Sequence, residues 1–223
     1  MGNNCIEELE NTADGIISQN LDFLREYAQI RSEGFKKALF TFSMIRLKAS
    51  FEASMLLMKN GYFIELSSVF RLILEQLSWG CYLFSTDESQ ASLDFSKIKS
   101  PQQTISCLKT TLNSNTYGQL YGLLSEGAHL PLKEITRYID KHADDYKVDI
   151  IFQAEKADSD DISILLLLIG TYVEVTCKGI NHFGFENKAQ ENDFNKRYND
   201  WYKEVALHLS ELMLSDAPLI EDQ

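Results

Sequence analysis

Proline is nearly absent from this sequence, with three in 223 residues, and glycine contributes only eleven. These two residues interrupt helices and form most tight turns, so their scarcity favours long helices over a sheet of many strands. The chain is long enough to bury a substantial core. We therefore expect an all-α fold in which residues 1–223 form a single domain. Its core should span about residues 11–183, followed by a C-terminal helix over about residues 193–214.

Cysteine is also scarce, and its spacing shows no metal-binding pattern. The four cysteines, at positions 5, 81, 107 and 177, lie far apart, and none belongs to a CxxC pair. A zinc site or a disulfide framework would need paired or regularly spaced cysteines. The pattern is typical of reduced, mostly buried thiols in an intracellular protein. We expect no metal site and no cofactor.

No apolar run is long enough to cross a bilayer, because the longest, Ile162–Gly170, is far shorter than a membrane-spanning helix. The N-terminal stretch MGNNCIEELENTADG is acidic and lacks the basic segment and apolar run of a signal peptide. Ile6 stands where a myristoylation signal has Ser or Thr. We expect a cytoplasmic protein with no membrane partner.

Positive charge is in short supply as well. The 21 Lys and Arg residues are outnumbered by 33 Asp and Glu residues, and the formal net charge is −12. A surface this acidic repels a phosphate backbone unless its basic residues gather in one place. RNA binding by a single chain is therefore disfavoured, whereas a dimer can still combine basic residues into one cleft.

Apolar residues at helical spacing predict most of the fold. We expect helices over about residues 11–32, 35–59, 62–84, 101–112, 116–128 and 160–183. Asn60 and Gly61 end the second of these, and the short turn makes it an antiparallel hairpin with the third. Beyond Pro131 the pattern is weaker: residues 132–142 suggest another short helix, and residues 146–153 suggest a strand or an extended connector.

The four long helices before residue 184 are expected to share one core, with Leu74 and Leu166 buried. Phe42 and Leu56 lie among the apolar residues at helical spacing in the segment over residues 35–59. The same segment carries small residues that would let a neighbouring helix approach closely: Ala49, Ser50, Ala53 and Ser54.

The segment over residues 62–84 is apolar on more than one side, which is typical of a central helix. One stripe of it is polar: Ser68, Arg71 and Glu75 lie close together on a helical wheel. Arg71 and Glu75 are four residues apart and can form an ion pair. Either this stripe faces solvent, or a second helix covers it and the charges line a buried site.

A second polar series follows in the stretch YGLLSEGAHLP at residues 121–131. Tyr121, Ser125 and His129 are spaced by four, so they follow one helix face. The series fits a hydrogen-bonded seam or a solvated face as well as a site. A serine hydrolase is disfavoured, because the strand and sharp turn that expose such a nucleophile are missing.

If the two polar stripes face each other, neither leaves a charge buried without a partner. We therefore predict that Arg71 and Glu75 lie within side-chain reach of Tyr121, Ser125 or His129. The histidine of such a pocket could titrate near neutral pH.

Residues 35–131 resemble a bacterial HEPN-like group. The resemblance is carried by the two helices joined by a Gly turn, the segment RLILEQ, and the Tyr-x-x-Leu-Ser-x-x-x-His stretch. It implies a HEPN-like bundle with additional C-terminal helices, which commonly forms a homodimer. It also implies a prokaryotic module of stress or phage defence, including toxin–antitoxin systems, that acts through protein contacts or a small bound ligand. The site residues it indicates are Arg71, Glu75, Tyr121, Ser125 and His129.

Many HEPN proteins are metal-independent ribonucleases that carry an Arg, four to six further residues, and a His. One formal match is present, Arg137 and His142 in RYIDKH, with Tyr138 in place of the usual small polar residue. Under this alternative, His142 is the general base or acid at the ribose 2′-hydroxyl, and Arg137 stabilises charge on the phosphate. The sequence leaves open whether the chain is an enzyme. A structural oligomerisation subunit is a third alternative.

A homodimer would need a contact surface, and the aromatic residues of the last helix are the candidates. We expect the contact to run through Trp201 and its apolar neighbours.

Overall fold

The computed structural model describes residues 3–28, 35–85, 100–128, 139–141, 148–150 and 159–215. Its helices are α1 (Asn3–Tyr27), α2 (Phe35–Lys59), α3 (Phe63–Ser85), α4 (Pro101–Thr111), α5 (Thr116–Gly127), α7 (Ser159–Phe183) and α8 (Lys188–Ser215). Two short strands, β1 (Ile139–Lys141) and β2 (Val148–Ile150), pair antiparallel. The predicted all-α class is confirmed.

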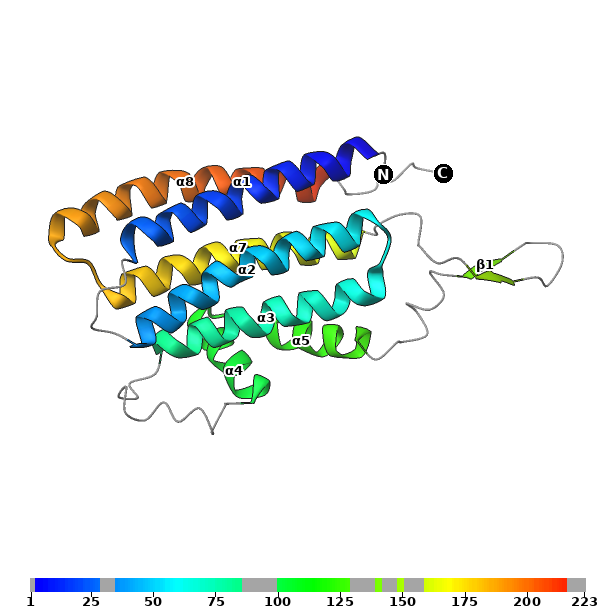
Figure 1. Cartoon of the computed structure of the whole chain (residues 1–223), viewed down its shortest axis with the longest axis horizontal. Coiled ribbons are helices and arrows are strands. Elements are labelled where there is room, and N and C mark those ends of the chain that lie inside the picture. The colour runs from blue at the N-terminus through cyan, green and yellow to red at the C-terminus, as the bar shows by residue number, and fades with distance from the viewer. Residues whose placement is uncertain are drawn as a thin grey trace.

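The helices stack in three layers (Figure 1). α1 and α8 run antiparallel and form one outer layer, α2 and α7 lie in the middle, and α3 forms the opposite layer with α4 and α5. The α2–α3 hairpin turns at Gly61, whose φ of 72° is the left-handed conformation that glycine adopts without strain. This is the turn that the Asn60–Gly61 pair predicts.

One apolar core runs through all three layers. It joins Leu24 of α1, Phe40 of α2, Leu74 of α3 and Leu166 of α7, and all four side chains are buried. The predictions that the four long helices share a core, and that Leu74 and Leu166 are buried, are confirmed. Their continuous contact accounts for the stability of a bundle whose individual helices would be marginal in water.

The helices α2, α3, α4, α5 and α7 begin and end within one residue of the predicted bounds. α1 begins earlier than predicted, because Leu9 and Ala13 continue its buried face toward the N-terminus, and it ends earlier, at Tyr27. α8 also begins earlier, at Lys188. The backbone N–H of Gln190 donates to the side-chain oxygen of Asn187 at 2.9 Å, which is an N-cap that the sequence reading overlooked.

The prediction of a helix over residues 132–142 is wrong at Ile139–Lys141, which form β1. Ile139 pairs with Ile150, so the strand satisfies its backbone groups across the ladder and not within a helical turn. The rest of that range lies outside the described residues. The predicted extended segment over residues 146–153 contains β2 and is confirmed there.

α7 is the one helix among the described residues that is long and apolar enough to cross a membrane by length and composition. In this fold, however, 61% of its most apolar segment is buried inside the bundle. Its apolar character is therefore accounted for by its place in the middle layer.

Candidate functional site

The two predicted polar stripes meet where α5 packs on α3. Arg71 Nε donates a hydrogen bond to Glu75 Oε1 at 3.0 Å. Tyr121 contacts both members of this ion pair: Arg71 Nη2 approaches its hydroxyl at 3.5 Å, and the hydroxyl donates to Glu75 Oε1 at 3.3 Å. The guanidinium also lies 5.5 Å from the centre of the Tyr121 ring. The prediction that Arg71 and Glu75 reach Tyr121 is confirmed.

Arg71 and Glu75 form a directly hydrogen-bonded ion pair. The hydrogen bond to Glu75 raises the pKa of Arg71 above its ordinary value, against the opposing effect of burial. The two side chains keep 32% and 28% of their surface exposed, so the pair is partly covered by α5. Both contacts to Tyr121 are long for hydrogen bonds, and each contributes little by itself.

Ser125 lies one turn beyond Tyr121 on α5. Its hydroxyl oxygen is buried and has no hydrogen-bond partner among the described residues. A Cβ added at Gly127 would come within 3.0 Å of Ser67 Oγ, so α5 sits directly against α3 at this end of the cluster. His129 follows α5 and lies outside the described residues, as do Arg137 and His142. A catalytic role for any of these residues stays a prediction.

A second polar cluster joins α1 to α8 and is missing from the sequence predictions. Arg197 binds both oxygens of Glu26, at 2.6 and 3.1 Å, and donates to the Tyr27 hydroxyl at 2.8 Å. Tyr27 in turn donates to Asp193 Oδ2 at 2.5 Å. The spacing of Asp193 and Arg197 by four hints at one pair, but only packing brings Glu26 and Tyr27 to them across some 170 residues.

The pKa values in this second cluster follow from its contacts. Burial raises the pKa of the Tyr27 phenol, and the hydrogen bond to Asp193 raises it further. The hydrogen bond from Tyr27 lowers the pKa of Asp193, and Arg197 adds to this effect. Glu26 raises the pKa of Arg197. The cluster therefore holds its charges at neutral pH and ties the two ends of the chain's helical part together.

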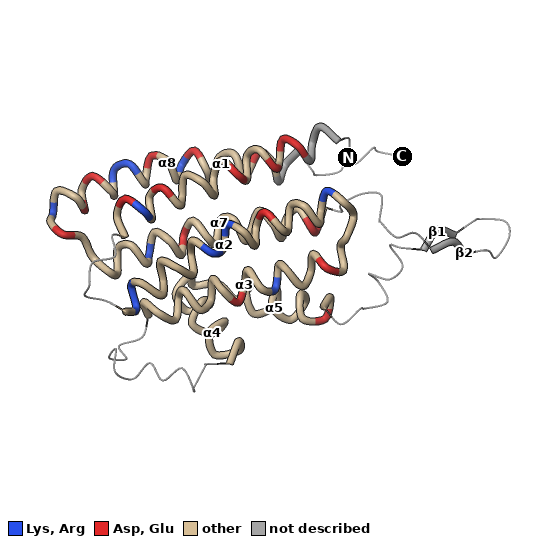
Figure 2. The backbone as a smooth tube through the Cα atoms, viewed as in Figure 1, with Lys and Arg blue, Asp and Glu red and all other residues tan. Residues whose placement is uncertain are grey.

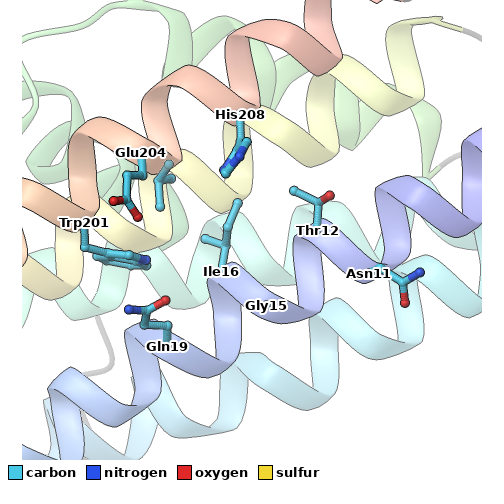
Figure 3. Close-up of a pocket in the computed structure, with 9 residues that line it drawn as sticks. Asn11, Thr12, Gly15, Ile16, Gln19, Trp201, Glu204 and His208 are labelled. Carbon is cyan, nitrogen blue, oxygen red and sulfur yellow. The ribbon is translucent and has the colours of Figure 1, made fainter.

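A hollow of about 270 Å³ lies along the seam between α1 and α8 (Figure 3). Its lining residues are Asn11, Thr12, Gly15, Ile16, Gln19, Trp201, Glu204, Val205 and His208. A second hollow of about 390 Å³ shares Gly15 and Gln19 with it and continues along the seam to Glu26 and Arg197. Gly15 has open space where a side chain would stand, which keeps the seam accessible.

Trp201 is buried in the wall of this hollow. Its ring centre lies 5.2 Å from that of Phe23 and 5.2 Å from that of Tyr198. The prediction that Trp201 supplies a dimer contact is therefore wrong: α8 uses this face to pack on α1.

Exposed apolar side chains lie along one side of α2. Phe42 and Leu56 are 62% and 61% exposed, and Ala49 between them is exposed too. We call these three residues, with the half-buried Ile45 and Ala53, the α2 face. α2 is apolar on both sides, and Phe40, Met44, Leu47 and Phe51 occupy its buried side.

Metal and nucleic-acid sites were the remaining possibilities within the part of the chain that the structure describes. No group of three or more His, Cys, Asp or Glu side chains in it is placed to hold a metal ion. Figure 2 shows acidic and basic residues interspersed along α1 and α8. The interspersed charges form no continuous basic track for a nucleic-acid backbone along these two helices.

Comparison of the chain with protein-family models, with curated proteins and with solved structures finds no match. The class that the fold defines is an all-α helical bundle, and function is inferred from its clusters and surfaces.

Proposed function

We propose that the protein is a HEPN-like helical module of prokaryotic stress or phage defence, which works in the cytoplasm through contact with another protein chain. The observation that supports a protein contact is the α2 face. Large apolar side chains that share one exposed helix face are costly to leave in water, and such patches mark binding surfaces for proteins.

A small bound ligand is the weaker form of this proposal. The hollows between α1 and α8 offer space for one, with Trp201 and Ile16 as apolar walls. Their rim residues Glu204 and His208, however, are exposed to solvent. Ligand sites usually enclose most of the ligand surface, and a seam open along its length does not.

The protein-contact proposal is tested by phage challenge of a bacterial host that expresses the chain. The variant Phe42→Ser/Leu56→Ser should lose protection against phage, or lose growth arrest where the chain itself arrests growth. Leu123→Ser is the matched control, because Leu123 is 57% exposed on α5, away from α2. Protection that persists in the double variant, with its thermal unfolding unchanged, would contradict the proposal.

The second candidate function is a metal-independent ribonuclease of the HEPN superfamily. What supports it is the neighbourhood of Ser125. Its buried hydroxyl has no partner among the described residues and lies one turn along α5 from Tyr121, whose phenol contacts the Arg71 guanidinium. Purified protein should then cleave RNA in the presence of EDTA, and His129→Ala or His142→Ala should abolish the cleavage. Equal cleavage by both variants and the parent protein would exclude this function.

The third candidate is a structural oligomerisation subunit. It shares the α2 face with the first proposal but predicts a different phenotype. In that case neither the parent protein nor the double variant Phe42→Ser/Leu56→Ser would affect phage infection or growth. The double variant would only lose the ability to assemble.

A further inference from the structure

We propose that Cys81 of α3 and Cys107 of α4 are a redox modification site, which forms a reversible disulfide when the protein meets hydrogen peroxide. Both cysteines are free thiols in the structure. They lie in the contact between α3 and α4, away from the α2 face, and the site does not depend on the proposed function.

Two contacts between hydroxyl groups fix the register of α4 on α3. The Ser78 hydroxyl donates to Thr104 Oγ1 at 2.9 Å, and Ser85 Oγ lies 3.1 Å from Thr111 Oγ1 in a second hydrogen bond. Each pair joins residues that are 26 positions apart, so the two helices run in the same direction and advance together. A residue on this face of α3 is therefore level with the α4 residue 26 positions further along the chain.

Cys81 and Cys107 are separated by the same 26 positions and lie between the two hydrogen bonds. On α3 the cysteine follows one serine by three positions and precedes the other by four, and on α4 the threonines repeat this spacing. A spacing of three and four places residues on the contact face of two parallel helices, where equivalent positions meet. The register therefore sets the two thiols opposite each other.

The helices come close enough at this level for a disulfide. A hydrogen bond between two short hydroxyl side chains holds their Cα atoms within about 8 Å of each other. Two straight helices are no farther apart between two such contacts than at the wider of them. A disulfide joins residues whose Cα atoms are roughly 4.4–6.8 Å apart. Little or no movement of α4 is therefore needed to bring the two sulfur atoms into bonding distance.

The two thiols differ in their access to solvent. Cys81 is fully buried, and this burial raises the pKa of its thiol, which the neighbouring Cys107 raises further. Cys81 is therefore protonated at neutral pH and shielded from an oxidant in solution. Cys107 is half-buried and reaches the surface. Because peroxide oxidises the thiolate that it can reach, Cys107 is the first to react.

The chemistry takes two steps. The Cys107 thiolate attacks one oxygen of hydrogen peroxide, the O–O bond breaks, and a sulfenic acid and water are formed. The Cys81 sulfur then attacks the Cys107 sulfur, and the sulfenic hydroxyl leaves with the Cys81 proton as a second water. A hydrogen bond with Thr111 lowers the pKa of Cys81 against the effect of burial, which helps this proton to leave. Two thiols have then lost two electrons, and one hydrogen peroxide has become two waters.

The disulfide is reversible because one of its sulfur atoms stays within reach of solvent. A thiol reductant can attack at Cys107 and restore both cysteines. While it exists, the bond fastens α4 to α3, and α5 packs on both of these helices. Oxidation therefore stiffens the layer in which α5 covers the Arg71–Glu75 ion pair.

The test uses the full-length variant Cys5→Ser/Cys177→Ser, which retains only the proposed pair of thiols. Hydrogen peroxide should remove both thiols and lower the intact mass by two hydrogen atoms, and peptide mapping should find Cys81 joined to Cys107. Dithiothreitol should restore both thiols. The oxidised form should unfold about 5–10 °C above the reduced form, because the bond closes a loop of 26 residues in the unfolded chain.

Two further variants of this protein separate the steps. With Cys81→Ala added, peroxide should leave a sulfenic acid at Cys107, which dimedone traps. With Cys107→Ser added instead, the buried Cys81 should stay a free thiol. The single variant Cys5→Ser is the matched control, because it keeps Cys177, another half-buried thiol, whose pKa burial raises to about 11. It should form the same disulfide and retain one free thiol, at Cys177.

Three outcomes would overturn the proposal. The first is that both thiols persist at a peroxide concentration that oxidises glutathione. The second is a disulfide that joins two protein chains, and the third is a sulfinic acid at Cys107 beside a free Cys81. The last two would show that the sulfur atoms do not meet within one chain.

Discussion

At the scale of single residues, Tyr121 links an ion pair on α3 to the helix that covers it. The i,i+4 spacing of Arg71 and Glu75 predicts their pairing, and the polar series on α5 predicts which helix face meets them. Which member of the series makes the contact is decided by packing. Gly127 lets α5 lie directly against Ser67, and the Ser125 hydroxyl is buried with no hydrogen-bond partner among the described residues. No spacing rule reveals either feature.

We expect Arg71→Ala to lower the free energy of unfolding by about 1–2 kcal/mol, because Glu75 would stay partly covered without its counter-charge. Tyr121→Phe removes only the hydroxyl with its two long contacts and should cost less, about 0.5–1 kcal/mol. Urea denaturation measures both. Arg25→Ala is the control, since Arg25 pairs with Asp22 in open solvent and should change little. If Arg71→Ala and Arg25→Ala lowered the free energy of unfolding equally, the cover by α5 would add nothing to the Arg71–Glu75 ion pair.

A pH dependence is expected from Asp193. Its pKa is lower in the folded protein than in the unfolded chain, chiefly because Tyr27 donates to it. Its contribution to stability is therefore complete above the unfolded value of about 4 and disappears as the pH falls through the lower folded value. The stability gap between the parent protein and Asp193→Asn should be present at pH 7 and close in acid. A gap that is constant from neutral to acidic pH would contradict the assignment.

At the scale of helices, the sequence predicts where most of them begin and end but not which side of α2 is buried. Apolar residues surround α2, so periodicity offers two faces and cannot rank them. In the structure, contacts with α3 and α7 decide which side of α2 is buried. Phe40 enters the gap that Gly80 and Gly179 leave in α3 and α7, and Phe42 on the other side stays in solvent.

Gly80 and Gly179 should respond differently to replacement by alanine. A Cβ at Gly179 would come within 2.1 Å of the Phe40 ring, which is itself packed against Phe84 and Phe183. Gly179→Ala should therefore cost about 1–3 kcal/mol through overpacking. At Gly80 the nearest atom is the terminal methyl of Met44, at 2.6 Å, which can rotate away. Because alanine also favours the helix by about 0.5–1 kcal/mol, Gly80→Ala should be close to neutral. Thermal unfolding of both variants decides, and a larger loss at Gly80 would refute this view of the contact.

At the scale of the whole molecule, the low proline and glycine content predicts the helical class, and the apolar segments predict a shared core. The layering is not readable from the sequence, because it depends on contacts such as Arg197 with Glu26 between opposite ends of the chain. The large separation in sequence also explains the error at Trp201. Its position in the last helix led us to expect a contact surface, whereas in the structure it packs against Phe23 of α1 and lines the hollow between α1 and α8.

The prediction that residues 1–223 form one domain can be tested with the two tryptophans. Trp201 reports on the α1–α8 layer through Phe23, and Trp79 reports on α3, where it stacks on Tyr82 with ring centres 5.4 Å apart. One core connects both layers through α7, so they should unfold together. We expect the single-tryptophan variants Trp79→Phe and Trp201→Phe to give urea transitions by fluorescence that coincide with their own transitions by circular dichroism. Trp201→Phe should have the lower midpoint of the two, because it removes part of a buried ring. If the fluorescence of Trp201 changes at a lower urea concentration than the helical signal of the same protein, α1 and α8 separate first. The chain would then consist of two cooperative units.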